Sequence, residues 1–297
     1  MLFPYQIPKE GALEGIPDWI DEIGYWSELK IEIIRKYAQA YSTILTKQPL
    51  HHIYVDAFAG GGEHRSKATG QVVKGSPLEV LDVQPPFEEY HFIDRGPRLA
   101  AALRRAVKGR QDVYVYEDDC NEVLVPQIIP RCRYEDFRRA LWVLDPKGMH
   151  YQWEIVAAAG RAQTVDLLLN FPIMDINRNA LWHDSARVTT EGRARMNAFW
   201  GDDSWTEIAY TGQSDLFGDE TQRKLSNRTV VDGYCLRVRT CAGFPHVARP
   251  LPMRNSRGAE VYYLVFASQN ADAVRIANDI FRKYGAVGIG PESPIGA

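Results

Sequence analysis

The sequence predicts an α/β fold built on a parallel sheet, because strand-like and helix-like segments alternate along most of the chain. Five apolar runs have the pattern of buried strands, at 53–57, 90–93, 113–116, 140–144 and 165–169. Helix-like segments separate these runs, and strands joined through helices pair in parallel. Two later apolar runs, near 234–240 and 261–267, have little helical pattern between them, so we expect them to pair antiparallel.

The expected helices rest on apolar spacing and on start signals. Between Trp26 and Leu45 apolar residues recur at helical spacing, which predicts a long amphipathic helix packed on the sheet. Ser76 is expected to be the N-cap of a second helix, with Pro77 in its first position. Further helices are expected at 97–107, 121–129, 151–160 and 272–284.

Three segments fall outside the alternating pattern. Residues 1–24 lack periodicity and are expected to wrap the surface, and 60–75 is expected to be a long loop, either a lid over substrate or disordered. At about 175–228 aromatic residues mix with charges and glycines, which predicts a mostly helical insertion that caps the strand ends with its own aromatic core. The predicted organisation is an N-terminal extension and helix at 1–48, then one Rossmann-like domain at 49–297.

Composition indicates a globular protein. The 297 residues are 45% apolar and 25% charged, and the net charge of -3 gives no sign of a strongly basic surface. The four cysteines, Cys120, Cys132, Cys235 and Cys241, lack CxxC spacing, which favours reduced thiols over structural zinc. The histidines form no metal-ligand set. With no signal peptide and no apolar run of about 20 residues, a cytoplasmic protein without a membrane segment is expected.

The most informative segment is the first strand with the turn that follows it. The apolar run ends at Asp56, and three consecutive glycines, Gly60–Gly62, follow soon after. Glycine permits positive φ and lets a ligand approach the backbone closely. Carboxylates also follow the second and third strands, at Asp94 and Asp119. Because the carboxyl ends of parallel strands meet at one edge, this pattern predicts a site for an adenosyl ligand.

Five parallel strands with a terminal antiparallel pair suit the methyltransferase variant of the doubly wound sheet. The chain also resembles the three-Cys-motif partner (TcmP) family, which is similar to S-adenosylmethionine (SAM)-dependent methyltransferases, from about Trp26 to Tyr284. The resemblance lies in the helix beginning Ser27-Glu28-Leu29-Lys30, in Asp56–Gly60, in Gly75-Ser76-Pro77, in Asp119-Cys120-Asn121, in Leu144–Gly148 and in Leu167–Pro172. It implies a SAM-methyltransferase sheet with SAM as cofactor, and the family name implies a cysteine-motif protein as partner.

A cofactor site follows from this resemblance and from the placement of the carboxylates. Ala59, Gly60, Gly61 and Gly62 are expected to present backbone N–H groups to the methionine carboxylate, and Phe58 in the same turn is a further predicted cofactor-binding residue. Asp56 is expected to hold the methionine amine, directly or through water. Asp94 is expected to accept both ribose hydroxyls. Asp119, with Cys120 beside it, is expected near adenine. For Asp94 and Asp119 the alternative role is that of a helix N-cap.

The acceptor side is predicted from the ends of the fourth and fifth strands. Amino-methyltransferases carry an Asp/Asn-Pro-Pro-aromatic motif at this place. The chain keeps Asp145-Pro146, but Lys147 follows directly, and both the second proline and the aromatic are missing. Asn170, followed by Phe171 and Pro172, offers an amide and an aromatic ring at the next strand. Asp145 and Asn170 are therefore the predicted catalytic residues, and Pro146, Lys147, Phe171 and Pro172 are the predicted substrate-binding residues. Structural turns are the alternative explanation for both motifs.

The predicted function is methyl transfer from SAM to a nitrogen or oxygen of an unidentified acceptor. Lys147 and the basic residues within 64–74 favour an anionic acceptor, either nucleic acid or a nucleotide. The alternative is a non-catalytic subunit in a complex with a cysteine-motif protein, because the aromatic is missing after Asp145-Pro146. A nicotinamide-dependent dehydrogenase is disfavoured, because the first turn lacks G-x-G-x-x-G.

Overall fold

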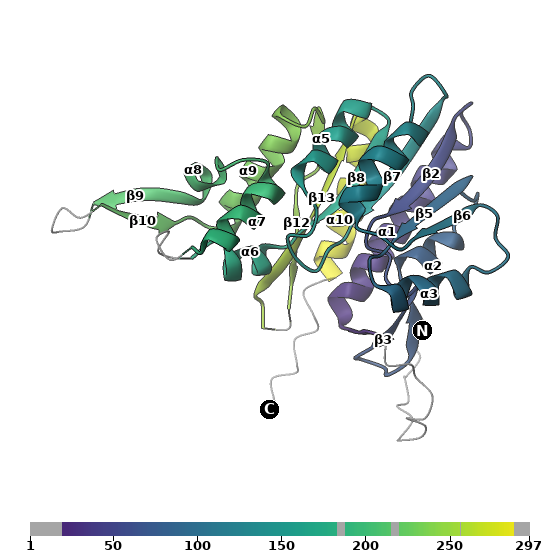
Figure 1. Cartoon of the computed structure of the whole chain (residues 1–297), viewed down its shortest axis with the longest axis horizontal. Coiled ribbons are helices and arrows are strands. Elements are labelled where there is room, and N and C mark those ends of the chain that lie inside the picture. The colour runs from purple at the N-terminus through teal and green to yellow at the C-terminus, as the bar shows by residue number, and fades with distance from the viewer. Residues whose placement is uncertain (1–19, 183–187, 215–219, 256, 288–297) are drawn as a thin grey trace.

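The computed structural model describes residues 20–182, 188–214, 220–255 and 257–287, and its centre is an eight-stranded sheet (Figure 1). The strands are β2 (His51–Asp56), β5 (Glu89–Ile93), β6 (Val113–Tyr116), β7 (Arg138–Leu144), β8 (Val165–Phe171), β11 (His246–Val247), β12 (Leu251–Arg254) and β13 (Glu260–Ser268). Their order is β11-β13-β8-β7-β2-β5-β6, and β12 also pairs with β13.

The strand directions confirm the predicted Rossmann-like methyltransferase sheet. The neighbours among β6, β5, β2, β7 and β8 pair in parallel, which makes five parallel strands in the predicted places. β13 runs antiparallel to β8, with Val265 opposite Leu169. β11 and β12 each run antiparallel to β13, so an antiparallel pair closes this side of the sheet.

One member of that pair lies later in the chain than the sequence predicted. Residues 234–240 belong to the helix α9 (Asn227–Thr240), and β11 and β12 take the expected strand's place. Within 234–240 the apolar residues alternate as in a strand, but Val230, Tyr234 and Val238 are buried at a spacing of four residues. The helical period is therefore visible only in a window that starts near Asn227.

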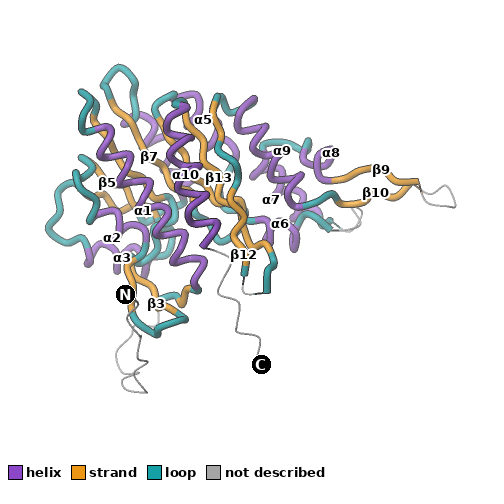
Figure 2. Tube along the Cα trace, turned by 180° about the vertical axis from the view of Figure 1, so that it is seen from behind, coloured by secondary structure: helices purple, strands orange, loops and turns teal. Residues whose placement is uncertain are grey.

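Helices cover both faces of the sheet (Figure 2). One face packs against α1 (Tyr25–Leu45), α2 (Ser76–Leu81), α3 (Pro97–Ala106) and α10 (Ala271–Val287). The other packs against α4 (Cys120–Val123), the π-helix Leu124–Ile128, the 3-10 turn Ile129–Arg131, α5 (Trp153–Ala162), α6 (Ile173–Asn179), α7 (Thr190–Trp200), α8 (Trp205–Ala209) and α9. Side chains alternate between these two cores, since Tyr54 lies in the first and Val55 in the second.

The segment 60–75 is not the long loop that the sequence predicted. It contains a hairpin of β3 (Glu63–Ser66) and β4 (Val72–Lys74), and β1 (Glu22–Ile23) adds a third strand in parallel with β3. Strand β3 consists of polar residues and β4 has only three residues, so neither shows the apolar alternation by which a strand is recognised in sequence. Residues 1–19, predicted to wrap the surface, lie outside the described part of the chain.

The segment 175–228 is helical in part. It holds most of α6, then α7 and α8, but also a hairpin of β9 (Tyr210–Ser214) and β10 (Glu220–Lys224) that projects from the body (Figure 1). Trp200 and Trp205 are fully buried, as expected for an aromatic core, whereas Trp182 is exposed. The division of the chain at residue 48 stays a prediction. None of the described helices is long and apolar enough to span a bilayer.

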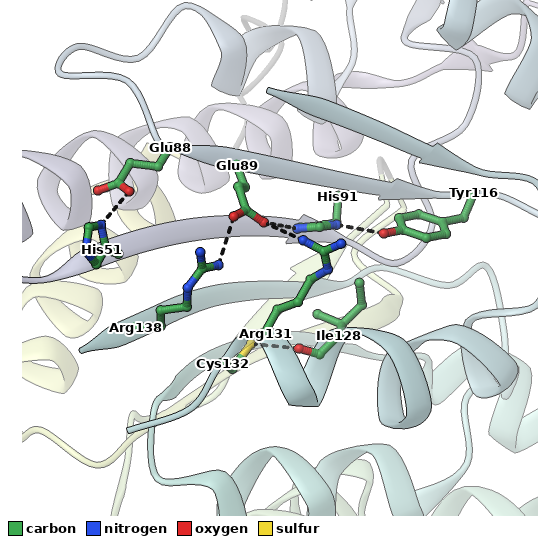
Figure 3. A network of polar contacts seen from close by, with 9 residues as sticks. All are labelled: His51, Glu88, Glu89, His91, Tyr116, Ile128, Arg131, Cys132 and Arg138. Carbon is green, nitrogen blue, oxygen red and sulfur yellow. Dashed lines mark hydrogen bonds and ion pairs between the residues drawn. The ribbon is translucent and has the colours of Figure 1, made fainter. Parts of the chain in front are cut away.

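A network of polar contacts joins three strands near the amino-terminal end of β5 (Figure 3). The carboxylate of Glu89 accepts hydrogen bonds from Arg138 at 2.8 Å and Arg131 at 3.1 Å, and lies 3.2 Å from Nε2 of His91. Nδ1 of His91 lies 3.0 Å from the hydroxyl of Tyr116 on β6. Hydrogen bonding to His91, followed by that to Arg138, lowers the pKa of Glu89 to about 2.

We expect Glu89→Gln to lower the free energy of unfolding by roughly 2 to 3 kcal/mol at pH 7, because the side chain is only 16% exposed. The folded-state pKa of Glu89 lies below its ordinary value of 4.5, so this stabilisation is present above about pH 4.5. It disappears as the pH falls toward 2. Urea unfolding of wild type and variant at several pH values measures the difference.

Glu88→Gln is the matched control for this experiment. Glu88 contacts His51 on the surface, with both side chains about half exposed (Figure 3). Such pairs contribute little, so a loss below about 0.5 kcal/mol is expected. Similar losses in the two variants, or a Glu89→Gln effect that does not change with pH, would contradict this account of the network.

Candidate functional site

A cleft with a volume of about 700 Å³ opens at the carboxyl ends of the parallel strands. Each of the five strands contributes residues from the turn that follows it: Ala57–Gly60 after β2, Asp94–Gly96 after β5, Asp118–Cys120 after β6, Asp145–Lys147 after β7, and Asn170 with Pro172 at the end of β8. Helix α1 and strand β1 form a further wall. Ligands of open α/β sheets bind at this edge, and the volume lies in the range of small-molecule sites.

The glycines after β2 have different roles. Gly60 lines the cleft with φ at 63°, and a Cβ built there would meet no atom within 4 Å, so a ligand has close access to its backbone. Gly62 has φ at 88° and packs against Leu78 and Leu103 instead. Gly61 and Gly62 are buried and do not line the cleft, which corrects their predicted contact with the cofactor.

The backbone N–H groups of Phe58, Ala59 and Gly60 already have acceptors within the protein. Phe58 donates to Asp56, Ala59 to the carbonyl of Ile93, and Gly60 to Asp94. The prediction that Ala59 and Gly60 present these donors to a ligand carboxylate is therefore wrong, and the N–H of Phe58 is likewise occupied. The turn still lines the cleft, so it shapes the cleft wall and lets a ligand approach the backbone at Gly60.

Asp56 does not reach the cleft. It is fully buried, and its carboxylate accepts hydrogen bonds from the hydroxyl of Ser76 at 2.6 Å and the N–H of Phe58 at 3.2 Å. Burial raises the pKa of Asp56 to about 6. The predicted contact with the methionine amine is therefore not available, and Asp56 holds the turn instead. Ser76 is the first residue of α2, not its N-cap, which is Gly75.

Asp94 joins the turns after β2 and β5. Its Oδ2 accepts the N–H of Gly60 at 2.9 Å and its Oδ1 accepts the N–H of Gly96 at 2.7 Å. The alternative role is wrong, because the N-cap of α3 is Gly96. A carboxylate has about four lone-pair positions, so two more hydrogen bonds are possible from the cleft that Asp94 lines.

Asp119 is the N-cap of α4 and also lines the cleft. Its Oδ1 accepts from the N–H of Asn121 at 2.9 Å and from Nδ2 of Asn121 at 2.7 Å. Asn121 in turn bonds to the backbone of His150 and Gln152, which fixes this turn to the loop after β7. Cys120 is buried beside Asp119, and burial raises the pKa of its thiol. The N-cap role of Asp119 is therefore confirmed, and its position near adenine stays a prediction.

Asp145 is held in an ion pair that the sequence did not reveal. The ammonium of Lys30 lies 2.7 Å from Oδ1 and 2.6 Å from Oδ2 of Asp145, and the two side chains are only 12% and 19% exposed. Burial alone would lower the pKa of Lys30, but the Asp145 carboxylate outweighs it and raises the pKa. Asn170 donates from Nδ2 to Asp145 and to the carbonyl of Pro146, both at 3.0 Å.

The other predicted acceptor residues separate into two groups. Pro146, Lys147 and Pro172 line the cleft, and Lys147 is 85% exposed and pairs with Asp21. Phe171 is fully buried among Phe199 and Tyr234 in the core on the other side of β8. Its predicted role in substrate binding is corrected, because neighbouring residues of a strand point to opposite faces.

Several residues of the cleft were not predicted as site residues. Lys30 comes from α1, His64 from β3, His150 from the loop after β7, Asp175 and Arg178 from α6, and Tyr262 from β13. Lys30 could have been noticed in the sequence. It follows Leu29 and lies three and four residues before Ile33 and Ile34, so its charge is at the edge of the apolar face of the predicted helix. The others are brought to the cleft by tertiary packing alone.

The described lining of the cleft carries an excess of negative charge. Its seven carboxylates are Asp21, Glu22, Asp94, Asp118, Asp119, Asp145 and Asp175, and its four basic side chains are Lys30, Arg95, Lys147 and Arg178. Burial lowers the pKa of both His64 and His150, which favours their neutral forms. The charge therefore favours a ligand that is itself cationic.

No family model matches the sequence, and no curated protein matches it either. Solved structures with a similar arrangement include a protein from Legionella pneumophila, at 12% identity and a TM-score of 0.46 over 87% of this chain and 93% of that one. A SAM-dependent methyltransferase from Leishmania major has 8% identity and a TM-score of 0.37, over 82% of each chain.

A SAM-dependent methyltransferase from Mesorhizobium loti has 12% identity and a TM-score of 0.35, over 77% of this chain and 97% of that one. At these TM-scores the assignment of the fold rests on the strand order and directions described above. The resemblance to the three-Cys-motif partner family stays a prediction.

We expect Lys30→Met to lower the free energy of unfolding by about 3 kcal/mol, because it leaves the carboxylate of Asp145 largely buried without its cation. Lys147→Met is the matched control, since its pair with Asp21 is exposed and a loss below about 0.5 kcal/mol is expected. Urea unfolding at pH 7 measures both. Equal, small losses in the two variants would show that the Lys30–Asp145 pair does not stabilise the fold.

Proposed function

We propose that the chain binds SAM in the cleft and transfers its methyl group to a nitrogen or oxygen of an acceptor. The observation that carries this proposal is the pair of turns joined by Asp94, where open backbone at Gly60 meets a carboxylate at the carboxyl edge of a methyltransferase-type sheet. The excess of carboxylates supports a ligand with a sulfonium and an ammonium group. Bound SAM supplies an electrophilic methyl group.

The residues that would hold the cofactor follow from their places along the cleft. Asp94 would accept the ribose hydroxyls with its remaining lone pairs. Asp119 and Cys120, on the turn after β6, would border the adenine. Lys30 is the one largely buried cation among the described lining residues, so it would pair with the methionine carboxylate in place of the turn's N–H groups.

The acceptor would enter beside Asp145 and Asn170. The ammonium of Lys30 contacts both carboxylate oxygens of Asp145, so an acceptor can reach them in its place only if Lys30 moves away. A contact between Lys30 and the methionine carboxylate would produce that movement. Asn170 would then orient Asp145 through its 3.0 Å hydrogen bond.

A nucleic acid or nucleotide acceptor remains part of this proposal, although three of the basic residues that favoured it in the sequence form ion pairs with carboxylates of the same chain. Arg65 pairs with Glu22, Lys74 with Asp82 and Lys147 with Asp21, so these basic residues are already compensated. An acceptor that presents a neutral base or amine to the cleft fits these surroundings better than one that presents phosphate there.

A second candidate function is a non-catalytic subunit, with the predicted cysteine-motif protein as its partner. The Lys30–Asp145 ion pair favours it, because the pair occupies the strand end where the acceptor would bind. Under this proposal the cleft keeps its cofactor and lacks transfer activity.

We expect Asp94→Asn to weaken binding of S-adenosylhomocysteine by about 30- to 150-fold, because the charge-assisted contacts to the ribose contribute roughly 2 to 3 kcal/mol. Isothermal titration calorimetry measures the change. Asp118→Asn is the matched control, since Asp118 is an exposed carboxylate of the same cleft, and its affinity should stay within about threefold of wild type. Unchanged affinity in Asp94→Asn excludes the ribose contact.

We expect Asp145→Asn to keep its affinity for S-adenosylhomocysteine within about tenfold while methyl transfer falls by about 100-fold or more, the scale for loss of a general base. Transfer of labelled methyl groups to RNA, DNA, nucleotides and protein fractions provides the measurement. Full activity in Asp145→Asn removes Asp145 from the catalytic residues. Absence of transfer by the wild type to every acceptor, with the cofactor bound, supports the non-catalytic subunit.

A further inference from the structure

A second cavity, with a volume of about 420 Å³, lies at the opposite edge of the sheet. It is bordered by the amino-terminal ends of β7 and β8, by the end of β13, and by the helices α1 and α10. None of the residues that line it also lines the SAM cleft. Nothing in the proposed methyl transfer uses this cavity.

One wall of the second cavity is apolar and aromatic. Helix α1 contributes Tyr37, Tyr41 and Ile44, and α10 contributes Ile276. Ile44 is 44% exposed, although it is a large apolar residue. An apolar wall of this kind, with a few polar groups converging on it, is typical of sites for small organic ligands.

Asp166 is the polar group of this cavity that lacks an opposite charge. Its Oδ2 accepts the hydroxyl of Tyr37 at 2.7 Å, and its Oδ1 accepts the hydroxyl of Ser268 at 2.5 Å. Among the described residues no lysine, arginine or histidine forms an ion pair with it. Two neutral hydroxyl donors leave the charge of a carboxylate uncompensated, and its half-buried position makes that unfavourable.

The other charged residues of the cavity are engaged elsewhere. Arg139 lies over the ring of Tyr134, with its guanidinium 4.6 Å from the ring centroid, and donates to the carbonyl of Arg138. Asp272 pairs with Arg275 at 3.1 Å on α10. Neither the guanidinium of Arg139 nor that of Arg275 forms an ion pair with the carboxylate of Asp166. Burial raises the pKa of Asp166 to about 6, which leaves it mostly ionised at pH 7.5.

We infer that this cavity binds a small amphipathic amine, with its ammonium on Asp166 and its apolar body against Tyr37, Tyr41 and Ile44. An ammonium offers three hydrogen-bond donors and a full positive charge, which matches the free lone pairs of the carboxylate. An aromatic or branched alkyl group on the ligand would bury the exposed apolar surface of this wall, which favours binding. This site goes beyond the proposed function, because it is separate from the SAM cleft.

Calorimetric titration of the full chain at pH 7.5 with 2-phenylethylamine, and with 2-phenylethanol as its neutral counterpart, tests the inference. The wild type should bind the amine at least about tenfold more tightly than the alcohol, the scale of a charge-assisted hydrogen bond. Asp166→Asn should remove that difference. Asp272→Asn, which deletes a carboxylate at the same cavity, should keep it.

Tyr37→Phe separates ligand binding from a structural role of Asp166. It removes one hydroxyl donor and keeps the carboxylate, so it should retain or strengthen amine binding even if the fold is less stable. Equal binding of amine and alcohol by the wild type overturns the inference. So does no binding of the amine up to about 10 mM, or an unchanged preference for the amine in Asp166→Asn.

Discussion

The candidate site depends on the carboxylate of Asp94, which accepts one N–H from each of two neighbouring turns. Because β2 and β5 are adjacent and parallel, their turns lie side by side, and Asp94 fixes the distance between Gly60 and Gly96. The buried carboxylate of Asp56 holds the first of these turns through the N–H of Phe58, and it is itself held by the hydroxyl of Ser76. At Phe58, Ala59 and Gly60 a ligand therefore meets backbone donors that are already paired, so there its polar groups depend on side chains.

Helix α1 makes the fold and the site depend on the same residues. Its buried residues Ile33, Tyr37 and Tyr41 pack on the sheet, while Lys30 reaches Asp145 at the carboxyl edge. Tyr37 and Tyr41 also border the second cavity at the other edge. A boundary at residue 48 would therefore separate residues that act together in both places. The ion pair of Lys30 with Asp145 joins helix α1 to the end of β7, and both of its residues line the cleft.

The central architecture could be predicted from sequence because its signals are local. Apolar runs ending in Asp56, Asp94 and Asp145 identify parallel strands and the edge at which their turns meet. Apart from the N-cap Asp119, whose partner Asn121 lies in the same turn, the side chains that accept or donate at these turns could not be predicted, because they depend on packing between distant segments. Asp56 faces the interior with Ser76 as its partner, and Lys30 approaches Asp145 from 115 residues earlier in the chain.

The incorrect predictions came from short segments whose residue pattern alone does not determine their structure. Residues 234–240 alternate like a strand, yet they continue a helix that begins at Asn227. Strand β3 is polar and β4 has only three residues, and the pairing of β3 with β1 is a tertiary contact that no local pattern predicts. Phe171 was assigned to the cleft with Asn170 and Pro172, but the alternation of a strand sends it to the opposite core.

The most direct test of the central claim is a crystal structure of the protein with S-adenosylhomocysteine. The account predicts that the ligand lies along the turns after β2, β5 and β6, with its ribose on Asp94 and its sulfur beside Asp145 and Asn170. It also predicts that Lys30 has turned from Asp145 to the methionine carboxylate. A ligand bound elsewhere, or bound in the cleft with its ribose away from Asp94, would contradict the account.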